Sequence, residues 1–157
     1  MMVLRCTRKL LQRLRQTPVE NAPISSTLLG DWYANVLFVS RKPLILAVSA
    51  RTLLPVLVPA RDPDSLGPRL AEALGEILGA LGIDSQQILH EQARMAELVF
   101  ARTISRQILG SMNDFDRMLD VAPGESLHSA ALQLAKAPCG PIGMESPQRA
   151  TVALFSA

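Results

Sequence analysis

The residues best suited to chemistry gather in one segment of the chain, between Arg102 and Leu119. Arginine, hydroxyl, amide and carboxylate side chains crowd into this segment, although 48% of the chain is hydrophobic. Arg102 and Arg106 could hold a phosphate group through paired hydrogen bonds, while Asp114 or Asp116 positions a water molecule or a metal ion. Such a set would suit a small hydrolase or nuclease. Without the catalytic groups, the same residues would suit a binding site.

The apolar residues of this segment predict that it forms a helix. They are Ile104, Ile108, Met112, Phe115 and Leu119, at intervals of four, four, three and four. This spacing places them on one helical face, which we expect to be buried. The helix should begin near Thr103 or Ser105, and its other faces should present the polar side chains.

Ser111, Asn113 and Asp114 are the binding candidates on those polar faces, together with the two arginines. A buried amide must find hydrogen-bond partners. Asn113 and Asp114 could therefore bond the backbone of residues 17–30 and fix the helix to that segment, or they could contact a ligand. Ser111 lacks the strand-turn-helix setting that a hydrolase serine requires.

A second candidate site is Asp31-Trp32-Tyr33-Ala34-Asn35, which contains the only Trp and the only Tyr of the chain. Neighbours in a strand face opposite ways, so one ring should be in the core while the other could be exposed. An exposed ring near arginines would suit stacking on a base or contact with a protein. Alternatively, Trp32 fills the edge of the sheet and Asp31 caps a turn.

Basic residues are concentrated at the N-terminus. Residues 1–16 carry five basic residues and no acidic one, whereas the remainder holds 11 basic and 14 acidic residues. Arg8, Arg13 and Arg15 could contact the phosphates of a nucleic acid. The alternative is that these charges form the solvated face of a short helix.

The sequence lacks the established motifs for cofactor and metal binding. It contains no glycine-rich phosphate loop, because Gly75 and Gly79 lie in a helical pattern, where we expect them to allow close packing. His90 and His128 belong to no zinc-binding pattern. We therefore predict that the protein uses no cofactor and no metal.

The two cysteines, Cys6 and Cys139, are expected to be free thiols in a reducing cytoplasm. Cys139 could form a nucleophilic set with His128 and Asp114, but no local signature supports such a set. The N-terminus lacks the apolar run of a signal peptide, and no segment approaches the roughly 18 apolar residues of a membrane span. We expect a cytoplasmic protein that does not contact membranes.

The order of the predicted elements indicates a single α+β domain over residues 1–157. We expect strands at 3–6, 33–40, 44–49, 53–58, 97–101 and 150–155, and helices at 8–15, 66–81, 84–94, 103–119 and 126–136. Three of these strands follow one another directly, which favours a mixed or mainly antiparallel sheet of about five to six strands, packed with four to five helices, over a doubly wound sheet. A turn is expected at 41–43, and Pro55 indicates either an edge position or a bulge for its strand.

Four blocks of the sequence resemble a known family. They lie at 4–11, 29–38, 51–59 and 101–115, and include the sequences LGDWYAN and LGSMNDF. Together they resemble an uncharacterised bacterial domain of unknown function of about 150 residues, of which the Gly110–Phe115 block is the most specific part. The resemblance implies a single domain in the bacterial cytosol and transfers no catalytic or binding residue.

The leading functional hypothesis is a non-enzymatic binding module. Its polar residues are concentrated in an arginine-rich helix that lacks a nucleophile, a base or a metal-binding set. We expect this helix and the Trp32 region to contact a protein or a nucleic acid. The alternative is a small hydrolase or nuclease that uses Asp114 or Asp116 with Arg102 and Arg106.

Overall fold

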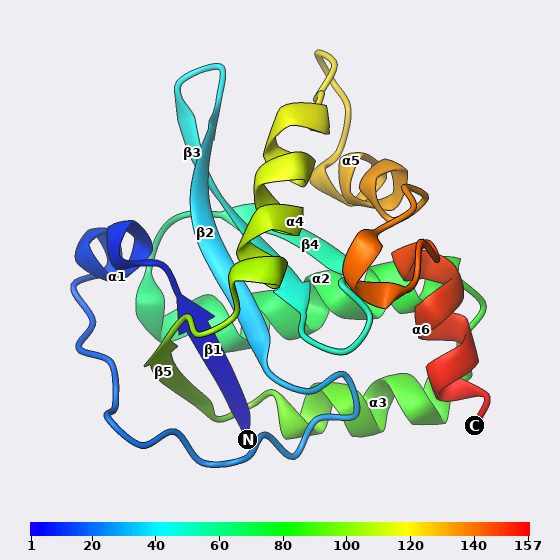
Figure 1. Ribbon diagram of the computed structural model, residues 1–157, viewed down its shortest axis with the longest axis horizontal. Helices are drawn as coiled ribbons and strands as arrows, with labels where there is room; N and C mark the ends of the chain where they lie inside the picture. The colour runs from blue at the N-terminus through cyan, green and yellow to red at the C-terminus, as the bar shows by residue number, and fades with distance from the viewer.

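A five-stranded mixed sheet lies at the centre of the computed structural model, which describes all 157 residues (Figure 1). The strands are β1 (Met2–Cys6), β2 (Trp32–Val39), β3 (Lys42–Ser49), β4 (Pro55–Pro59) and β5 (Leu98–Arg102). Their order in the sheet is β4-β3-β2-β1-β5. β1 pairs in parallel with both β2 and β5, whereas β2, β3 and β4 pair antiparallel. β4 is an edge strand, so the first of the two alternatives predicted from Pro55 is confirmed.

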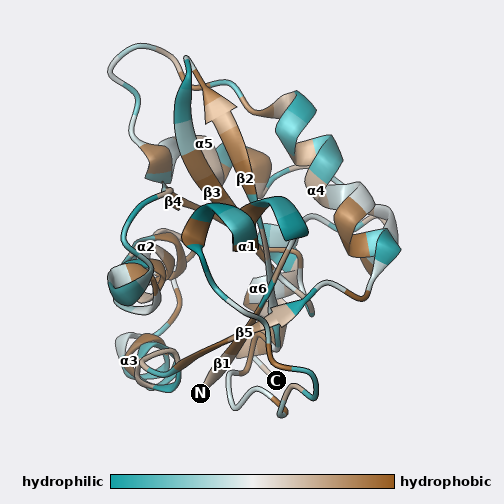
Figure 2. Ribbon diagram, turned by 90° about the vertical axis from the view of Figure 1, so that its left-hand side faces the viewer, coloured by the Kyte–Doolittle hydropathy of each residue, from teal (hydrophilic) through white to brown (hydrophobic).

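Six α-helices surround the sheet. They are α1 (Arg8–Leu14), α2 (Leu66–Ala80), α3 (Ser85–Arg94), α4 (Arg106–Met118), α5 (Leu127–Leu134) and α6 (Pro147–Phe155). α4 covers one face of the sheet, while α2 covers the other with α3 beside it (Figures 1 and 2). The α+β class is confirmed, with one helix more than expected. None of the helices has both the length and the apolar character that crossing a membrane requires.

Polar side chains fix the starts of several helices where the sequence predicts them. Asp84, Ser105 and Ser126 each accept a hydrogen bond from a backbone N–H in the first turn of α3, α4 and α5, respectively. Such a cap typically contributes about 1 kcal/mol to helix stability. The cap at Ser105 makes α4 begin at Arg106.

The hairpin between β2 and β3 closes through only two residues, Ser40 and Arg41. Val39 pairs with Lys42, and the two turn residues have φ angles of 50° and 66°. Positive φ at both positions is characteristic of the type I′ turn, whose twist matches that of the flanking strands. The predicted turn at 41–43 is therefore shifted, because Lys42 and Pro43 belong to β3.

Two predictions from the apolar pattern are wrong. Residues 150–155, predicted as a closing strand, belong to α6, because the Ser146 hydroxyl caps that helix and Pro147 occupies its first position. Ile104 was expected on the buried face of the 103–119 helix, but it precedes α4 and is 74% exposed. Apolar periodicity alone did not distinguish these cases.

The close packing predicted at the two helical glycines holds only for Gly75. A side chain at that position would collide with the amide of Gln92 on α3, which donates a hydrogen bond to the Ala71 carbonyl at 2.9 Å. Gly79 faces open space, so its predicted packing role is wrong.

The long connection between α1 and β2 is held in place by a buried carboxylate on α3. Glu91 accepts hydrogen bonds from the backbone N–H groups of Leu28 and Leu29 at 2.8 and 2.9 Å. Asn113 was one predicted anchor for this segment, but it is exposed and its side chain makes no hydrogen bond. The alternative in which Asn113 anchors this segment is wrong, because the anchoring group comes from α3, while a ligand contact at Asn113 stays a prediction.

Phe115 should be the main stabilising side chain of α4, since it is fully buried beneath the helix, with the largely buried Ile108 and Met112 on the same face. We expect Phe115→Ala to lower the free energy of unfolding by about 3–5 kcal/mol, as is typical of large-to-small changes in a core. Asn113→Asp on the same helix is the matched control and should change it by no more than about 0.5 kcal/mol. Urea titrations of both variants test this, and a Phe115→Ala loss below about 1 kcal/mol would contradict it.

Candidate functional site

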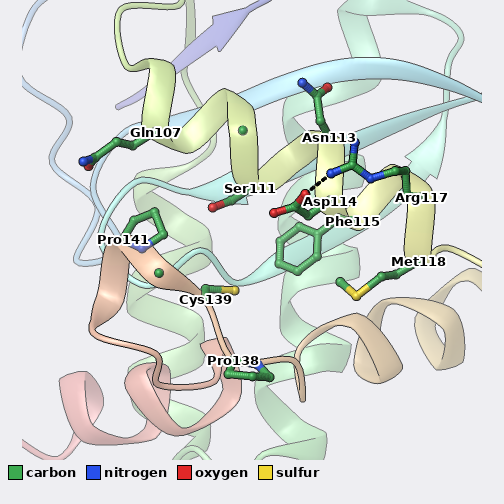
Figure 3. Close-up of a pocket in the computed structure, with 12 residues that line it drawn as sticks. Gln107, Ser111, Asn113, Asp114, Phe115, Arg117, Met118, Pro138, Cys139 and Pro141 are labelled. Carbon is green, nitrogen blue, oxygen red and sulfur yellow. Dashed lines mark hydrogen bonds and ion pairs between the residues drawn. The ribbon is translucent and has the colours of Figure 1, made fainter.

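The polar side of α4 faces a cavity of about 560 Å³, which we call the α4 pocket. It is lined by Gln107, Gly110, Ser111, Asn113, Asp114, Phe115, Arg117 and Met118 of α4 and by residues 138–141. Figure 3 shows Asp114 directed at Arg117, with which it forms an ion pair, and Asn113 pointing away from the 138–141 loop. The sequence block expected to carry a site therefore does line a pocket.

The α4 pocket lacks an activated nucleophile. Burial raises the pKa of the Cys139 thiol, and the nearby Asp114 carboxylate raises it further. The thiol therefore stays protonated at neutral pH, whereas a reactive cysteine needs a lowered pKa. The Ser111 hydroxyl has no hydrogen-bond partner that could act as a base. His128 does not line this pocket. Its Nδ1 is instead 3.8 Å from a carboxylate oxygen of Glu76.

The two arginines and two aspartates of the hydrolase hypothesis do not come together in any one of the four main pockets. Asp114 lines the α4 pocket and is paired with Arg117, while Arg102 lines a different cavity. Arg106 and Asp116 are exposed on α4 and line none of the four. No three His, Cys, Asp or Glu side chains form a group that could hold a metal ion. The geometry therefore gives this hypothesis no support.

Trp32 and Tyr33 are both buried at the start of β2. The expectation that one ring is exposed is wrong, because β2 is the central strand and is covered on both faces. For the same reason Trp32 does not fill a sheet edge, and its indole N–H has no hydrogen-bond partner. Burial raises the pKa of Tyr33, an effect that the positive charge of Arg5 opposes. Neither ring is accessible for stacking on a ligand.

A second cavity, of about 700 Å³, lies at the carboxyl ends of the parallel strands β1 and β5. Its charged residues are Arg8 and Arg15 of the α1 region and Arg102 at the end of β5, and no acidic residue lines it. We call this cavity the basic groove. The carboxyl ends of parallel strands are a recurrent place for ligand sites in open α/β sheets.

The basic groove is formed by the direct passage of the chain from β1 into α1. The Thr7 hydroxyl accepts a hydrogen bond from Leu10 N–H at 3.3 Å and starts the helix immediately after β1. Residues 16–18 then close the groove as they run toward the Val19 N–H, which donates to the Phe100 carbonyl of β5 at 2.9 Å. The groove therefore joins two regions that are far apart in the sequence.

Arg5 fixes the position of Arg102 at one side of the groove. The guanidinium of Arg5 donates to the Asp31 carboxylate at 2.8 Å and to the Arg102 carbonyl at 2.9 Å. Asp31 also accepts a hydrogen bond from the Ser25 hydroxyl at 2.6 Å. The carboxylate predicted to cap a turn thus holds two strands together.

The arginines of the basic groove are all uncompensated. Arg8, Arg15 and Arg102 are exposed, and none forms an ion pair. Gln12, Gln16, Thr17 and Thr103 line the same groove and add neutral hydrogen-bonding groups. Arg13, the third basic residue proposed for nucleic-acid contact, lies over the ring of Phe38 instead of in the groove. Sequence reasoning treated the basic N-terminus and Arg102 separately and missed the glutamines and threonines between them.

The sequence model of the family described as Domain of unknown function (DUF6933) matches residues 3–150. The chain belongs to this family. The match runs from β1 into the first turn of α6 and includes every residue that lines the two pockets. A comparison with curated proteins found no match. Membership in DUF6933 thus confirms the expected resemblance and assigns no activity to the basic groove.

The Cys6 thiol at the base of the basic groove should make stability fall at alkaline pH. Burial raises its pKa from the ordinary 9.0 to about 12. Between these values the unfolded chain releases this proton while the folded chain keeps it, so the free energy of unfolding decreases as pH rises. From pH 8 to pH 10 we expect the free energy of unfolding to fall by about 1 kcal/mol more in the parent than in Cys6→Ala. Urea unfolding across this range measures it, and parallel pH profiles would contradict it.

Proposed function

We propose that this protein is a nucleic-acid-binding module and that its contact site is the basic groove. The observation that carries this proposal is the convergence of Arg8, Arg15 and Arg102 on one cavity without an acidic residue. Guanidinium groups hold phosphate oxygens through paired hydrogen bonds and remain charged at all physiological pH values. The groove therefore offers a site for phosphates.

The remaining lining of the groove suits the sugar-phosphate backbone. Gln12 and Gln16 supply amide groups, and Thr17 and Thr103 supply hydroxyl groups. Arginine, amide and hydroxyl side chains are the usual partners of phosphate and sugar oxygens in nucleic-acid complexes. Contacts of this kind position a strand without reading its sequence.

The distribution of charge beyond the groove favours a linear polyanion over a compact acidic protein. Residues 1–19 and 32–61 contain no Asp or Glu. The exposed side of α1 carries Lys9 and Arg13 outside the groove, and the hairpin turn carries Arg41. An extended field of one sign attracts a chain of regularly spaced phosphates and makes its binding dependent on salt.

The proposal places this module in the cytoplasm of a bacterium, as expected from the sequence. Both thiols are buried and free. Free cysteines are typical of a reducing compartment. The lack of an activated nucleophile or a metal-binding group in the α4 pocket and the basic groove supports binding over catalysis.

Neutralising the groove should weaken the binding of nucleic acid. The test variant is the triple substitution Arg8→Gln, Arg15→Gln and Arg102→Gln, measured by fluorescence anisotropy with a labelled oligonucleotide. At about 50 mM salt we expect at least a tenfold loss of affinity. The slope of log K against log salt should flatten by about 2, because each phosphate contact on a single strand contributes roughly 0.7.

The matched control removes three other exposed arginines, Arg94, Arg117 and Arg149, on α3, α4 and α6. It changes the net charge equally but should bind close to the parent. Equal losses in both triple variants would overturn the proposal, as would the absence of parent binding at low salt. Competition by polyglutamate at the same charge concentration as the oligonucleotide would indicate an acidic protein partner instead.

Arg15→Gly separates binding from folding. Arg15 adopts a left-handed conformation at the end of α1, with a φ angle of 55°. Glycine adopts this conformation without strain, which should stabilise the folded state by about 1–2 kcal/mol. Its greater freedom in the unfolded chain should lower stability by roughly 0.4–1 kcal/mol. We therefore expect unchanged or slightly higher stability in urea together with weaker oligonucleotide binding. A marked loss of stability, or undiminished binding, would contradict this prediction.

A further inference from the structure

Phe38, near the end of β2, is a large apolar side chain that the fold leaves 51% exposed. Two cations of α1 lie over its ring. Lys9 Nζ is 5.6 Å and Arg13 Cζ is 5.5 Å from the ring centroid. Distances of about 6 Å or less are typical of cation–π contacts. Phe38 is therefore an exposed aromatic ring held within the basic surface.

The helical spacing of α1 places this ring next to the basic groove. At about 100° per residue, Arg8, Gln12 and Arg15 form one stripe along the helix, and Lys9 and Arg13 form the adjoining stripe. The third stripe is buried against the sheet and consists of Leu10, Leu11 and Leu14. Figure 2 shows the hydrophilic outer side of α1 in front of the β2–β3 hairpin.

We infer that the nucleic acid bound by this protein is single-stranded and that one of its bases stacks on Phe38. The inference rests on the proposed function, because the arginines of the basic groove must hold the same strand. An α-helix with its side chains is about 10–12 Å across. A short stretch of one strand can therefore extend from the groove across α1 to the ring.

The chemistry around Phe38 favours a single strand over a duplex. Aromatic rings bind single strands because every unpaired base exposes a π-face, whereas the bases of a duplex are already stacked on one another. Lys9 and Arg13 project from the same side of α1, so they cover the ring from the helix and leave its remaining surface to solvent. Phosphates on either side of a stacked base would lie near these two cations.

The ring cannot be explained by the needs of the core. The apolar core consists of buried residues on both faces of the sheet, and Phe38 is not among them. Its partner in the hairpin register is Pro43, which is only partly buried. The two cation–π contacts with α1 use only part of the ring, and about half of the side chain stays exposed, which stacking would use.

The test compares the parent with Phe38→Leu and Phe38→Trp. Fluorescence anisotropy at constant salt measures binding to an oligothymidylate of about 20 nucleotides, longer than the roughly 4–16 nucleotides of typical single-strand sites, and to a duplex of the same length. We expect Phe38→Leu to weaken oligothymidylate binding about tenfold, within the range for loss of one stacked base. The salt slope should stay unchanged, because stacking releases no counterions.

Phe38→Trp should bind the oligothymidylate about as tightly as the parent, because the indole can also stack on a base. The fluorescence of the added indole should be quenched when the oligothymidylate binds. Trp32 gives the background signal in the parent, since it is buried. Leu89→Ala, which removes another exposed apolar side chain on α3, is the matched control and should bind like the parent.

Different outcomes overturn this inference and the proposed function. Undiminished binding by Phe38→Leu, or an equal loss for the duplex, would overturn the stacking inference. If the groove variant then still lost affinity, the proposed function would stand alone. Failure of the parent to bind either oligonucleotide at low salt would overturn both.

Discussion

The parallel pairing of β1 with two neighbours is the constraint on which the rest of this structure depends. Cys6 pairs with Ala34 of β2 on one side and with Arg102 of β5 on the other. Because β1 leads directly into α1, this register sets the basic helix beside the end of β5. The basic groove exists only as a consequence of that pairing. A strand with two parallel partners also requires a long crossover, which here runs from α1 to β2 across the lower edge of the molecule in Figure 1.

Two carboxylates hold that crossover in place, and neither of them lines the basic groove. Glu91 is buried beneath the crossover, where it accepts two backbone hydrogen bonds, and Asp31 binds Arg5 and Ser25. Burying a carboxylate without partners is strongly unfavourable, whereas one that accepts several hydrogen bonds can fix a segment of otherwise irregular backbone. Arg5 is consequently the one N-terminal arginine that is neutralised by an ion pair. The exposed arginines of the basic groove have no carboxylate partner, so their positive charge is not neutralised. The interactions that order the crossover thus also determine where the surface is positive.

Local features of the fold could be predicted from the sequence, as could the single arginines of the candidate site, but not their convergence on one groove. Capping residues such as Asp84 and Ser105, and the edge position of Pro55, depend on short-range chemistry that the sequence displays directly. The pairing of β1 with β5 joins residues nearly a hundred positions apart, and no local pattern specifies it. Arg102 was therefore assigned to the α4 segment although it belongs to the groove. Phe38 falls within the strand predicted at 33–40, and its exposure near the end of the hairpin cannot be read from alternation.

Two positions on the basic surface carry arginine where the backbone alone would favour glycine. Arg15 ends α1, and Arg41 lies in the β2–β3 turn, and both have positive φ angles. Glycine takes this conformation at positions such as Gly30 and Gly82, but four other residues with side chains adopt it too: Ser40, Leu53, Asp62 and Met144. The left-handed region costs a residue with a side chain about 1–2 kcal/mol. Arginine at these two positions therefore lowers the stability of the fold, while it adds positive charge to the surface. Strained backbone is often found at functional sites. Two of the six strained positions with side chains are arginines, and both lie on the side of the molecule proposed to contact a polyanion.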